Sequence, residues 1–256
     1  MEIGSSPLFY EVMTMQEQFL RTQMLLGEDA MRILKGSHVA VFGVGGVGSY
    51  AVEALVRSGV GELTLIDDDT VSVTNLNRQI EALWSTVGQN KTDAVAARCR
   101  DISPDVVLHP ICARYDAAHR DLFFSSHYDY IIDAIDTVSS KLDLIETALS
   151  RNIPILSALG TGNKLDATQL TITDISKTYN CSLARVMRKE LKNRGIRHLQ
   201  VLFSPELPIK PEELEAPPPG RRSVPASVAW VPACAGLMMG GEVVKRLIAH
   251  KEGETI

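Results

Sequence analysis

A glycine-rich turn is the first feature of the sequence that predicts chemistry. In VAVFGVGGVGSY, Gly43, Gly45 and Gly48 form a GxGxxG spacing directly after an apolar run, and Gly46 adds a fourth bare backbone position. Missing side chains let backbone N–H groups and a helix N-terminus approach phosphate, where the helix dipole favours negative charge. The turn therefore predicts a nucleotide site. Close packing of a helix on a strand is the alternative explanation for the glycines.

Polar residues after the second apolar run indicate which nucleotide is bound. Asp67 stands about 20 residues beyond the glycines, where a carboxylate accepts hydrogen bonds from ribose hydroxyls. Asn75, Arg78 and Lys91 follow, and two cations with an amide donor suit a polyphosphate longer than the pyrophosphate of NAD. We predict an ATP site that also includes Asp69. The alternative is that Arg78 and Lys91 are ordinary surface cations.

Two carboxylates end a later apolar run, IIDAID. Asp133 and Asp136 would lie at the carboxyl end of a strand, where open α/β sheets expose their ligand crevice. A carboxylate there can bind Mg²⁺ through oxygen ligands shared with phosphates. The alternative role for Asp136 is the N-cap of the following helix.

The elements that position these residues alternate between strand and helix. Short apolar runs such as HVAVFG, LTLIDD and YDYIIDAID are separated by helical stretches such as GSYAVEALVRSG and VSSKLDLIETALSRN. This alternation predicts an α/β, Rossmann-like, doubly wound and mostly parallel sheet covered on both faces.

One domain spanning 1–256 is expected. Residues 15–36 form an N-terminal helical extension with a break at Gly27, and 37–160 form the nucleotide-binding core. Residues 161–256 form a substrate-side elaboration of strands and helices. Within it, the proline-rich and charged segment 205–225 is expected to be an exposed, mobile loop.

Composition excludes several classes of protein. The chain has 256 residues, is 45% hydrophobic and carries a formal charge of −5, which argues against nucleic-acid binding through the whole surface. No apolar run is long enough to cross a membrane and the start does not resemble a signal peptide, so a cytoplasmic location is expected. The four cysteines form no CxxC, so no zinc site and no disulfide framework is predicted. Cys181 and Cys234 are interpreted as packing residues.

A local positive stripe interrupts this acidic composition. The segment ARVMRKELKNRGIRH, residues 184–198, is rich in Arg and Lys, and a solvated helix face is the ordinary explanation of such a run. The candidates for RNA contact are Arg185, Arg188, Lys189, Lys192 and Arg194. Arg221 and Arg222 would add phosphate contacts. Tyr179 and Trp230 are interpreted as core residues, with base stacking as the alternative.

Several unusual elements occur in one order: GxGGxGS, LIDDDTVSVTNLNRQ, VGQNK and AIDT. Together they resemble the adenylating family of the ubiquitin-activating enzymes and the activators of molybdopterin synthase and thiamine-biosynthesis sulfur carriers. RTQMLLGEDAM, GNKLDATQL and LARVMRKELKNRGI extend the likeness to its branch of tRNA threonylcarbamoyladenosine dehydratases.

The resemblance implies ATP and Mg²⁺ as cofactors and tRNA as substrate, with dehydration of threonylcarbamoyladenosine through an acyl-adenylate. It puts Asp67 on the ribose, Asn75, Arg78 and Lys91 on the phosphates, and Asp136 on Mg²⁺. It also implies a homodimer in which Arg21 reaches the partner's γ-phosphate, and a sulfur-relay accessory protein as a further partner.

Two other functions share some of these residues. An activator of a sulfur-carrier or ubiquitin-like protein would use the same ATP residues, but the missing CxxC pairs and the basic segment disfavour it. A nicotinamide-dependent oxidoreductase would use the glycines, but Arg78, Lys91 and the lack of a recognisable hydride-transfer residue disfavour it.

Overall fold

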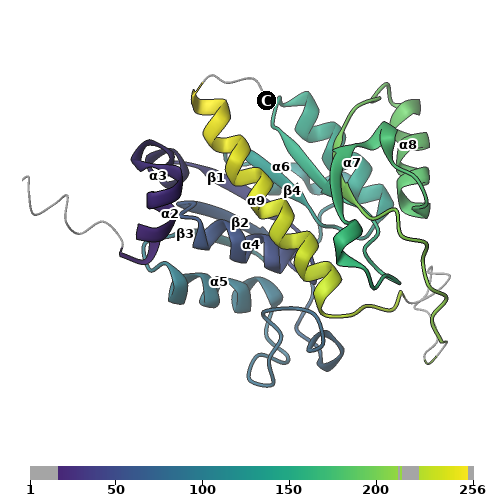
Figure 1. Cartoon of the computed structure of the whole chain (residues 1–256), viewed down its shortest axis with the longest axis horizontal. Coiled ribbons are helices and arrows are strands. Elements are labelled where there is room, and N and C mark those ends of the chain that lie inside the picture. Colours follow the sequence, from purple (N-terminus) through teal and green to yellow (C-terminus); the bar gives the residue numbers. More distant parts are fainter. Residues whose placement is uncertain (1–16, 213, 215–224, 253–256) are drawn as a thin grey trace, which may run out of the picture.

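A seven-stranded sheet forms the centre of the protein (Figure 1). The computed structural model describes residues 17–212, 214 and 225–252. The strand order is β3-β2-β1-β4-β5-β7-β6, and every pair is parallel except β6 with β7. The strands are β1 (His38–Phe42), β2 (Glu62–Ile66), β3 (Val107–Ile111), β4 (Tyr130–Asp133), β5 (Ile155–Ala158), β6 (Thr171–Asp174) and β7 (Gln200–Phe203). The predicted mostly parallel, doubly wound sheet is confirmed.

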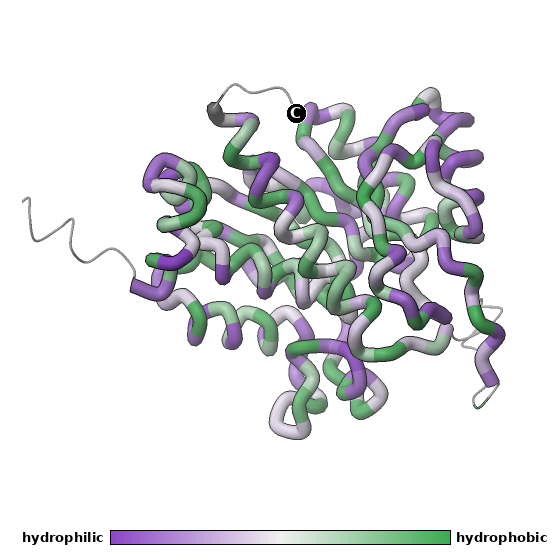
Figure 2. The backbone as a smooth tube through the Cα atoms, in the orientation of Figure 1, coloured by the Kyte–Doolittle hydropathy of each residue, from purple (hydrophilic) through white to green (hydrophobic). Residues whose placement is uncertain are grey.

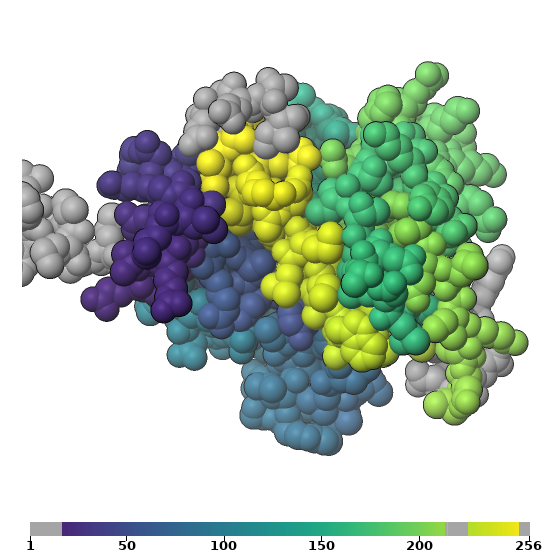
Figure 3. Space-filling model, in the orientation of Figure 1, coloured from purple at the N-terminus to yellow at the C-terminus, as the bar shows by residue number. Residues whose placement is uncertain are grey.

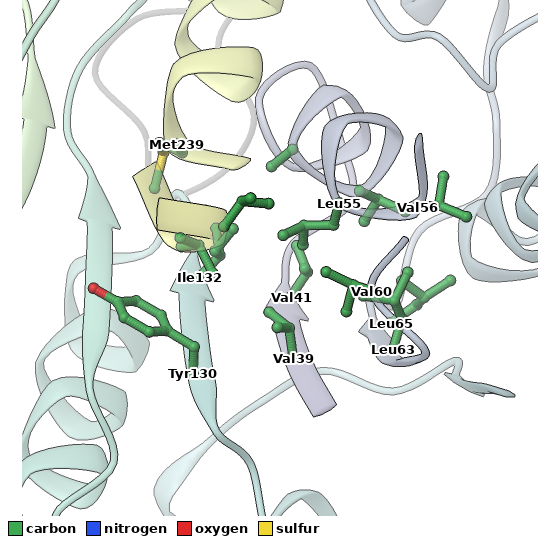
Figure 4. Packing of buried hydrophobic residues seen from close by; sticks show 14 of the residues in the cluster. Val39, Val41, Leu55, Val56, Val60, Leu63, Leu65, Tyr130, Ile132 and Met239 are labelled. Carbon is green, nitrogen blue, oxygen red and sulfur yellow. The ribbon is translucent and has the colours of Figure 1, made fainter. Parts of the chain in front are cut away.

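Helices cover both faces of the sheet, as the alternating sequence pattern predicts. On one face lie α4 (Gly48–Arg57), α5 (Lys91–Ile102) and α9 (Trp230–Glu252); on the other lie α6 (Arg120–Phe123), α7 (Val138–Ser150) and α8 (Ser182–Asn193). Alternate residues of each central strand enter the two cores. Val39 and Val41 point toward Leu55 of α4 (Figure 4), whereas Ala40 and Phe42 face the aromatic cluster behind the sheet.

The two outer strands differ from the central ones in exposure. Strands β1 and β4 are buried along their whole length, whereas β3 and β6 are partly exposed. Pro110 in β3 is compatible with an edge position because proline offers no N–H to a further strand.

The N-terminal helices lie beside the amino ends of the strands. Turn η1 (Glu17–Phe19), α2 (Leu20–Leu26) and α3 (Glu28–Lys35) precede β1, and the predicted break at Gly27 is present, with φ of 88°. Phe19 is buried against Gly59, which precedes β2. Met24 and Leu25 of α2 are 80% and 85% exposed. The α2–α3 segment forms one end of the molecule beside α9 (Figure 3).

The C-terminal third adds β6, β7, α8 and α9 together with the short turns η4 (Ala167–Gln169) and η5 (Ile175–Lys177). Hydrophilic residues predominate along α8 (Figure 2). Of the segment 205–225, positions 213 and 215–224, including Arg221 and Arg222, lie outside the described residues. Among the helices that are described, none has the length and apolar character needed to cross a membrane.

Two glycines let α9 approach α4 closely. A Cβ atom at Gly236 would lie 2.2 Å from Val47 O, and one at Gly240 would lie 2.5 Å from Ala54 Cβ and 2.9 Å from Ala51 O. The later glycine on α9 contacts the later residues of α4, so the two helices run side by side in the same direction. Helix α9 therefore covers the helix that begins at the glycine-rich turn.

A matched pair of substitutions tests this contact. Gly240→Ala is expected to lower the free energy of unfolding by about 1–3 kcal/mol, because the added methyl group overpacks a tight crossing. Gly241→Ala meets no atom within 4 Å and is expected to raise stability by about 0.5–1 kcal/mol through helix propensity. Urea denaturation of both variants measures the difference, and equal effects would contradict the close approach.

Candidate functional site

A large cavity opens at the carboxyl ends of β1, β2 and β4. It has a volume of about 1930 Å³ and lies where the strand order reverses between β1 and β4, the usual ligand position in open α/β sheets. Typical small-ligand pockets have about 300–1,000 Å³, so this cavity has room for a nucleotide and a second ligand. The predicted site residues that line it are Gly43, Gly45, Gly46, Asp67, Asp69, Asn75, Arg78, Lys91 and Asp136.

The glycines of the turn are needed for different structural reasons. Gly43 has a φ of 84°, and a Cβ atom there would lie 2.7 Å from Ala134 O. Gly48 is not among the cavity-lining residues; its Cβ would lie 1.8 Å from Gly43 O, so it permits the turn itself. Gly45 and Gly46 present backbone to the cavity directly before α4.

Asp67 holds the turn and the second strand together. Its Oδ2 accepts a hydrogen bond from Val44 N at 2.8 Å, and its Oδ1 accepts one from Asp69 N at 2.9 Å. Burial raises the pKa of this carboxyl, while Lys91 acts in the opposite direction. Each oxygen retains a second lone pair, so the side chain can still accept a hydroxyl donor from the cavity.

The predicted phosphate residues lie on the segment between β2 and α5. Lys91 begins α5, and its buried Nζ is 2.7 Å from Asp69 Oδ2. Arg78 Nη1 donates to Thr74 O at 2.8 Å, which fixes the guanidinium beside the cavity. Asn75 Oδ1 accepts from the backbone N–H of Ser72, so its Nδ2 is the donor end of that amide. Neighbouring bonds thus restrict all three side chains.

The two carboxylates after β4 separate into a buried and an exposed one. Asp133 is fully buried, forms an ion pair with Lys141 Nζ at 2.9 Å and accepts a hydrogen bond from Ser157 Oγ at 2.6 Å. Its role is therefore structural. Asp136 is exposed and lines the cavity. The alternative role as helix N-cap is wrong, because Thr137 occupies the N-cap of α7.

Comparisons with known proteins agree with this arrangement. A profile of the ThiF family matches residues 19–256. The chain belongs to the ThiF family. A tRNA threonylcarbamoyladenosine dehydratase of Bacillus subtilis is 44% identical over 93% of this chain and 97% of that protein. The Escherichia coli molybdopterin-synthase adenylyltransferase is 33% identical over 60% of this chain and 61% of that protein. A crystal structure of the Escherichia coli tRNA N6-threonylcarbamoyladenosine dehydratase in complex with ATP has a TM-score of 0.83 and 32% identity, covering 99% of this chain and 100% of that one.

Arg21 of this ThiF-family protein lies far from its own cavity. It is exposed on α2, at the amino edge of the sheet, and does not line the cavity at the carboxyl edge. A five-residue strand such as β1 spans about 16 Å, and this separates the two edges. Arg21 is therefore not among the residues of its own chain that border the cavity.

Sequence reasoning missed three polar residues around the ThiF-family cavity. Arg114 and Gln79 line it, and Glu81 is buried nearby, beside the Ser49 hydroxyl. Arg114 follows β3, so the strand-end rule that found Asp67 would also have found it. No sequence signal distinguishes Glu81 from a surface acid. Burial raises its pKa to about 7, while Lys91 acts in the opposite direction.

The raised pKa of Glu81 predicts a stability difference that depends on pH. A carboxyl whose folded pKa exceeds its unfolded value favours folding below the unfolded pKa and loses that contribution as pH rises through the folded pKa. From a pKa of 4.5 to about 7 the loss amounts to about 3 kcal/mol. We expect Glu81→Gln, which resembles the neutral acid, to match the parent at pH 4.5 and to exceed it by about this amount at pH 8. Urea denaturation at both pH values checks this; the same difference at each would exclude a raised pKa.

The basic stripe divides into paired and exposed side chains. Arg194 pairs with Glu146 and Glu190, at 3.0 and 3.2 Å, and Arg188 donates to Thr178 O. The remaining cations line a shallow groove beside α8: Arg185, Lys189, Lys192 and Arg197.

The predicted core positions of Tyr179 and Trp230 are wrong. The two residues are 57% and 51% exposed. Tyr179 packs edge to face on Phe203, and the indole N–H of Trp230 donates to Leu165 O at 2.7 Å, so each ring is fixed at the surface by one contact. Cys181 is buried and accepts a hydrogen bond from Ala184 N at the start of α8, and Cys234 is half-buried and packs against the core, so both agree with the interpretation as packing residues.

Proposed function

We propose that this protein is an ATP-dependent tRNA threonylcarbamoyladenosine dehydratase. The observation that carries the proposal is the cavity at the carboxyl edge of the sheet, which gathers glycine backbone, two cations and carboxylates in a chain with a dehydratase-like sequence over almost its whole length. ATP activates the threonyl carboxylate of the modified adenosine as an acyl-adenylate and releases pyrophosphate. The acyl-adenylate then loses AMP as the substrate closes a ring.

Charge neutralisation explains the phosphate residues. Arg78 and Lys91 stand on two separate elements that border the cavity, and each faces negative charge that develops as pyrophosphate leaves. Asp69 holds Lys91 at the cavity wall when no phosphate is bound. Asp67, already tied to the glycine turn, accepts the ribose hydroxyls.

Mg²⁺ fits the oxygen donors that face the cavity. Asp136 lies on one side, and the carboxylates of Asp67, Asp68 and Asp69 lie close to one another on another. Oxygen ligands of this kind suit Mg²⁺, which neutralises phosphate oxygens when bound. We assign Asp136 as its protein ligand.

Ring closure needs no nucleophile from the protein. A nitrogen or oxygen of the substrate's carbamoyl group attacks the acyl carbon, the bond from that carbon to AMP breaks, and a carbamoyl N–H proton is lost to water. An intramolecular attack gains from proximity what a thiol would otherwise supply. Cys181 is buried and cannot serve as an acyl acceptor, whereas Cys112 is exposed.

The exposed cations of α8 provide a surface for tRNA phosphates. Because Arg188 and Arg194 are held by intramolecular bonds, Arg185, Lys189 and Lys192 carry most of the proposed contact. These side chains border one groove, and basic side chains on a single face are the electrostatic signature of nucleic-acid contact.

Charge reversal tests this surface. Changing Arg185, Lys189 and Lys192 to Glu is expected to weaken tRNA binding and to lower the slope of log K against log salt by about 0.7–0.9 per lost phosphate contact. ATP binding should stay the same. The control carries the same change of net charge elsewhere, at Arg57, Arg100 and Lys245. Equal tRNA binding by both triple variants would leave α8 as an ordinary solvated face.

A homodimer with shared sites accounts for the position of Arg21. The exposed apolar residues of α2, Met24 and Leu25, are the type of surface that a second subunit covers. Contact through this end would carry Arg21 to the partner's cavity. The sulfur-relay accessory protein and the cytoplasmic location remain predictions.

The alternative, an activator of a sulfur-carrier or ubiquitin-like protein, shares the ATP residues. The similarity to the adenylyltransferase covers 60% of this chain and that to the dehydratase 93%, so the dehydratase also matches the C-terminal elaboration. The decisive experiment is incubation with native tRNA, ATP and Mg²⁺ followed by mass analysis of nucleosides. Loss of one water from threonylcarbamoyladenosine is expected. Unchanged nucleoside, with AMP formation only when a carrier protein is supplied, would favour the alternative.

A further inference from the structure

Three side chains with metal-ligand atoms meet at the amino edge of the sheet. His38, Glu62 and His109 come from the neighbouring strands β1, β2 and β3. His38 lies opposite Glu62 in the strand register, and Thr64 lies opposite His109, so all four side chains project from the same face. The ligand atoms of the two histidines and the glutamate lie within 4.8 Å of one another.

The distances place the glutamate between the two imidazoles. Glu62 Oε1 is 3.4 Å from His38 Nδ1 and 2.7 Å from His109 Nε2, and the ring centroids are 5.5 Å apart. Donors bound tetrahedrally to Zn²⁺ at about 2.0–2.1 Å lie about 3.3 Å from each other. The first distance already fits this spacing. The distance from Glu62 Oε1 to His109 Nε2 must lengthen by a few tenths of an ångström, and rotation of the exposed His109 ring can provide this.

Neighbouring groups fix the buried member of the set. His38 Nε2 lies 2.8 Å from Thr64 Oγ1, and the Tyr128 ring packs edge to face against the imidazole at 4.9 Å. A hydrogen bond at one ring nitrogen orients the other nitrogen toward a metal, as in many metal sites.

Access and ligand number also suit a metal. Glu62 and His109 side chains are 38% and 44% exposed, so an ion can enter from solvent and keep a water as its fourth ligand. The other described histidine and carboxylate pairs, His119 with Asp116 and His198 with Asp174, contain a single histidine each. The length of a strand separates the cluster from the nucleotide cavity, so it is a distinct site.

We propose that His38, Glu62 and His109 bind a divalent transition metal of the zinc class, with His38 Nδ1, a Glu62 oxygen and His109 Nε2 as ligands. Such an ion ties the edge strand β3 to β2 and β1. This proposal departs from the prediction of no zinc, which rested on the absence of CxxC and therefore on thiolate ligands alone.

Cobalt absorption tests the site on the full, untagged chain. Co²⁺ is expected to bind once per chain with a visible d–d band that Zn²⁺ abolishes and Mg²⁺ does not. His109→Ala and Glu62→Gln should weaken Co²⁺ binding at least tenfold, whereas the matched control His119→Ala should bind as the parent does. Circular dichroism checks that each variant is folded. Fewer than one Co²⁺ per chain in the parent, or unchanged binding in both ligand variants, would overturn the proposal.

Discussion

Arg78→Ala is expected to lower the rate of tRNA-dependent pyrophosphate release by about 100-fold to 1,000-fold, the usual effect of losing one donor to transition-state charge. The guanidinium borders the cavity and is held by Thr74 O, so its position is fixed before the nucleotide binds. Arg78→Lys keeps the charge but loses the planar donor geometry, and it should recover only part of the rate. Pyrophosphate release and ATP binding are measured separately, because an effect confined to ATP binding would show that Arg78 contributes no selective stabilisation of the transition state.

Asp136→Ala should reduce the same rate by a similar factor if this carboxylate binds Mg²⁺, and a higher Mg²⁺ concentration should restore part of it. Arg100→Ala is the matched control, since Arg100 is exposed on α5 and does not line the cavity. Normal turnover in a folded Arg78→Ala or Asp136→Ala variant would remove that residue from the site.

Mixing two inactive variants is expected to restore activity if subunits share their sites. Arg21→Ala and Asp136→Ala subunits are each inactive alone in this arrangement. In a mixed dimer one site carries both lesions and the other carries neither. Random exchange makes about half of the dimers mixed, and half of their sites intact, so activity should return to about a quarter of the parental value.

Two controls make the mixing experiment decisive. Subunit exchange is followed by mass-labelled chains, and Arg78→Ala mixed with Asp136→Ala should stay inactive, because both residues line one cavity and every site in the mixed dimer is damaged. No recovery with Arg21→Ala despite exchange would contradict a role for Arg21 in the partner's site.

The parts of the fold that follow from local pattern were predictable from sequence. The alternation of strand and helix patterns predicted the parallel sheet, and Gly27 predicted the break between α2 and α3. The polar residues directly after the strands predicted the position of the cavity. Parallel strands all end at one edge, so Gly43 and Asp67 must come together once each strand is recognised.

What depends on distant partners was not predictable. Arg194 belongs to a positive run in the sequence, yet Glu146 on α7 pairs with it. In the sequence Glu81 resembles a surface acid, but in the fold it is buried. Trp230 resembles a core residue, but it lies half-exposed at the start of α9. Charge and hydrophobicity along the chain do not report such long-range contacts.

The tight crossing of α4 and α9 has a consequence for how the protein is made. Helix α4 begins at the phosphate-binding turn, but its glycine-lined neighbour is translated roughly 190 residues later, a wait of about 10–40 s at typical synthesis rates of about 5–20 residues per second. Until Gly236 and Gly240 emerge from the ribosome, the side of α4 that contains Ala51 and Ala54 is not covered by α9. The nascent chain must therefore pass through a stage in which its earliest functional motif is exposed to chaperones and to aggregation, and nucleotide binding becomes possible only near the end of synthesis.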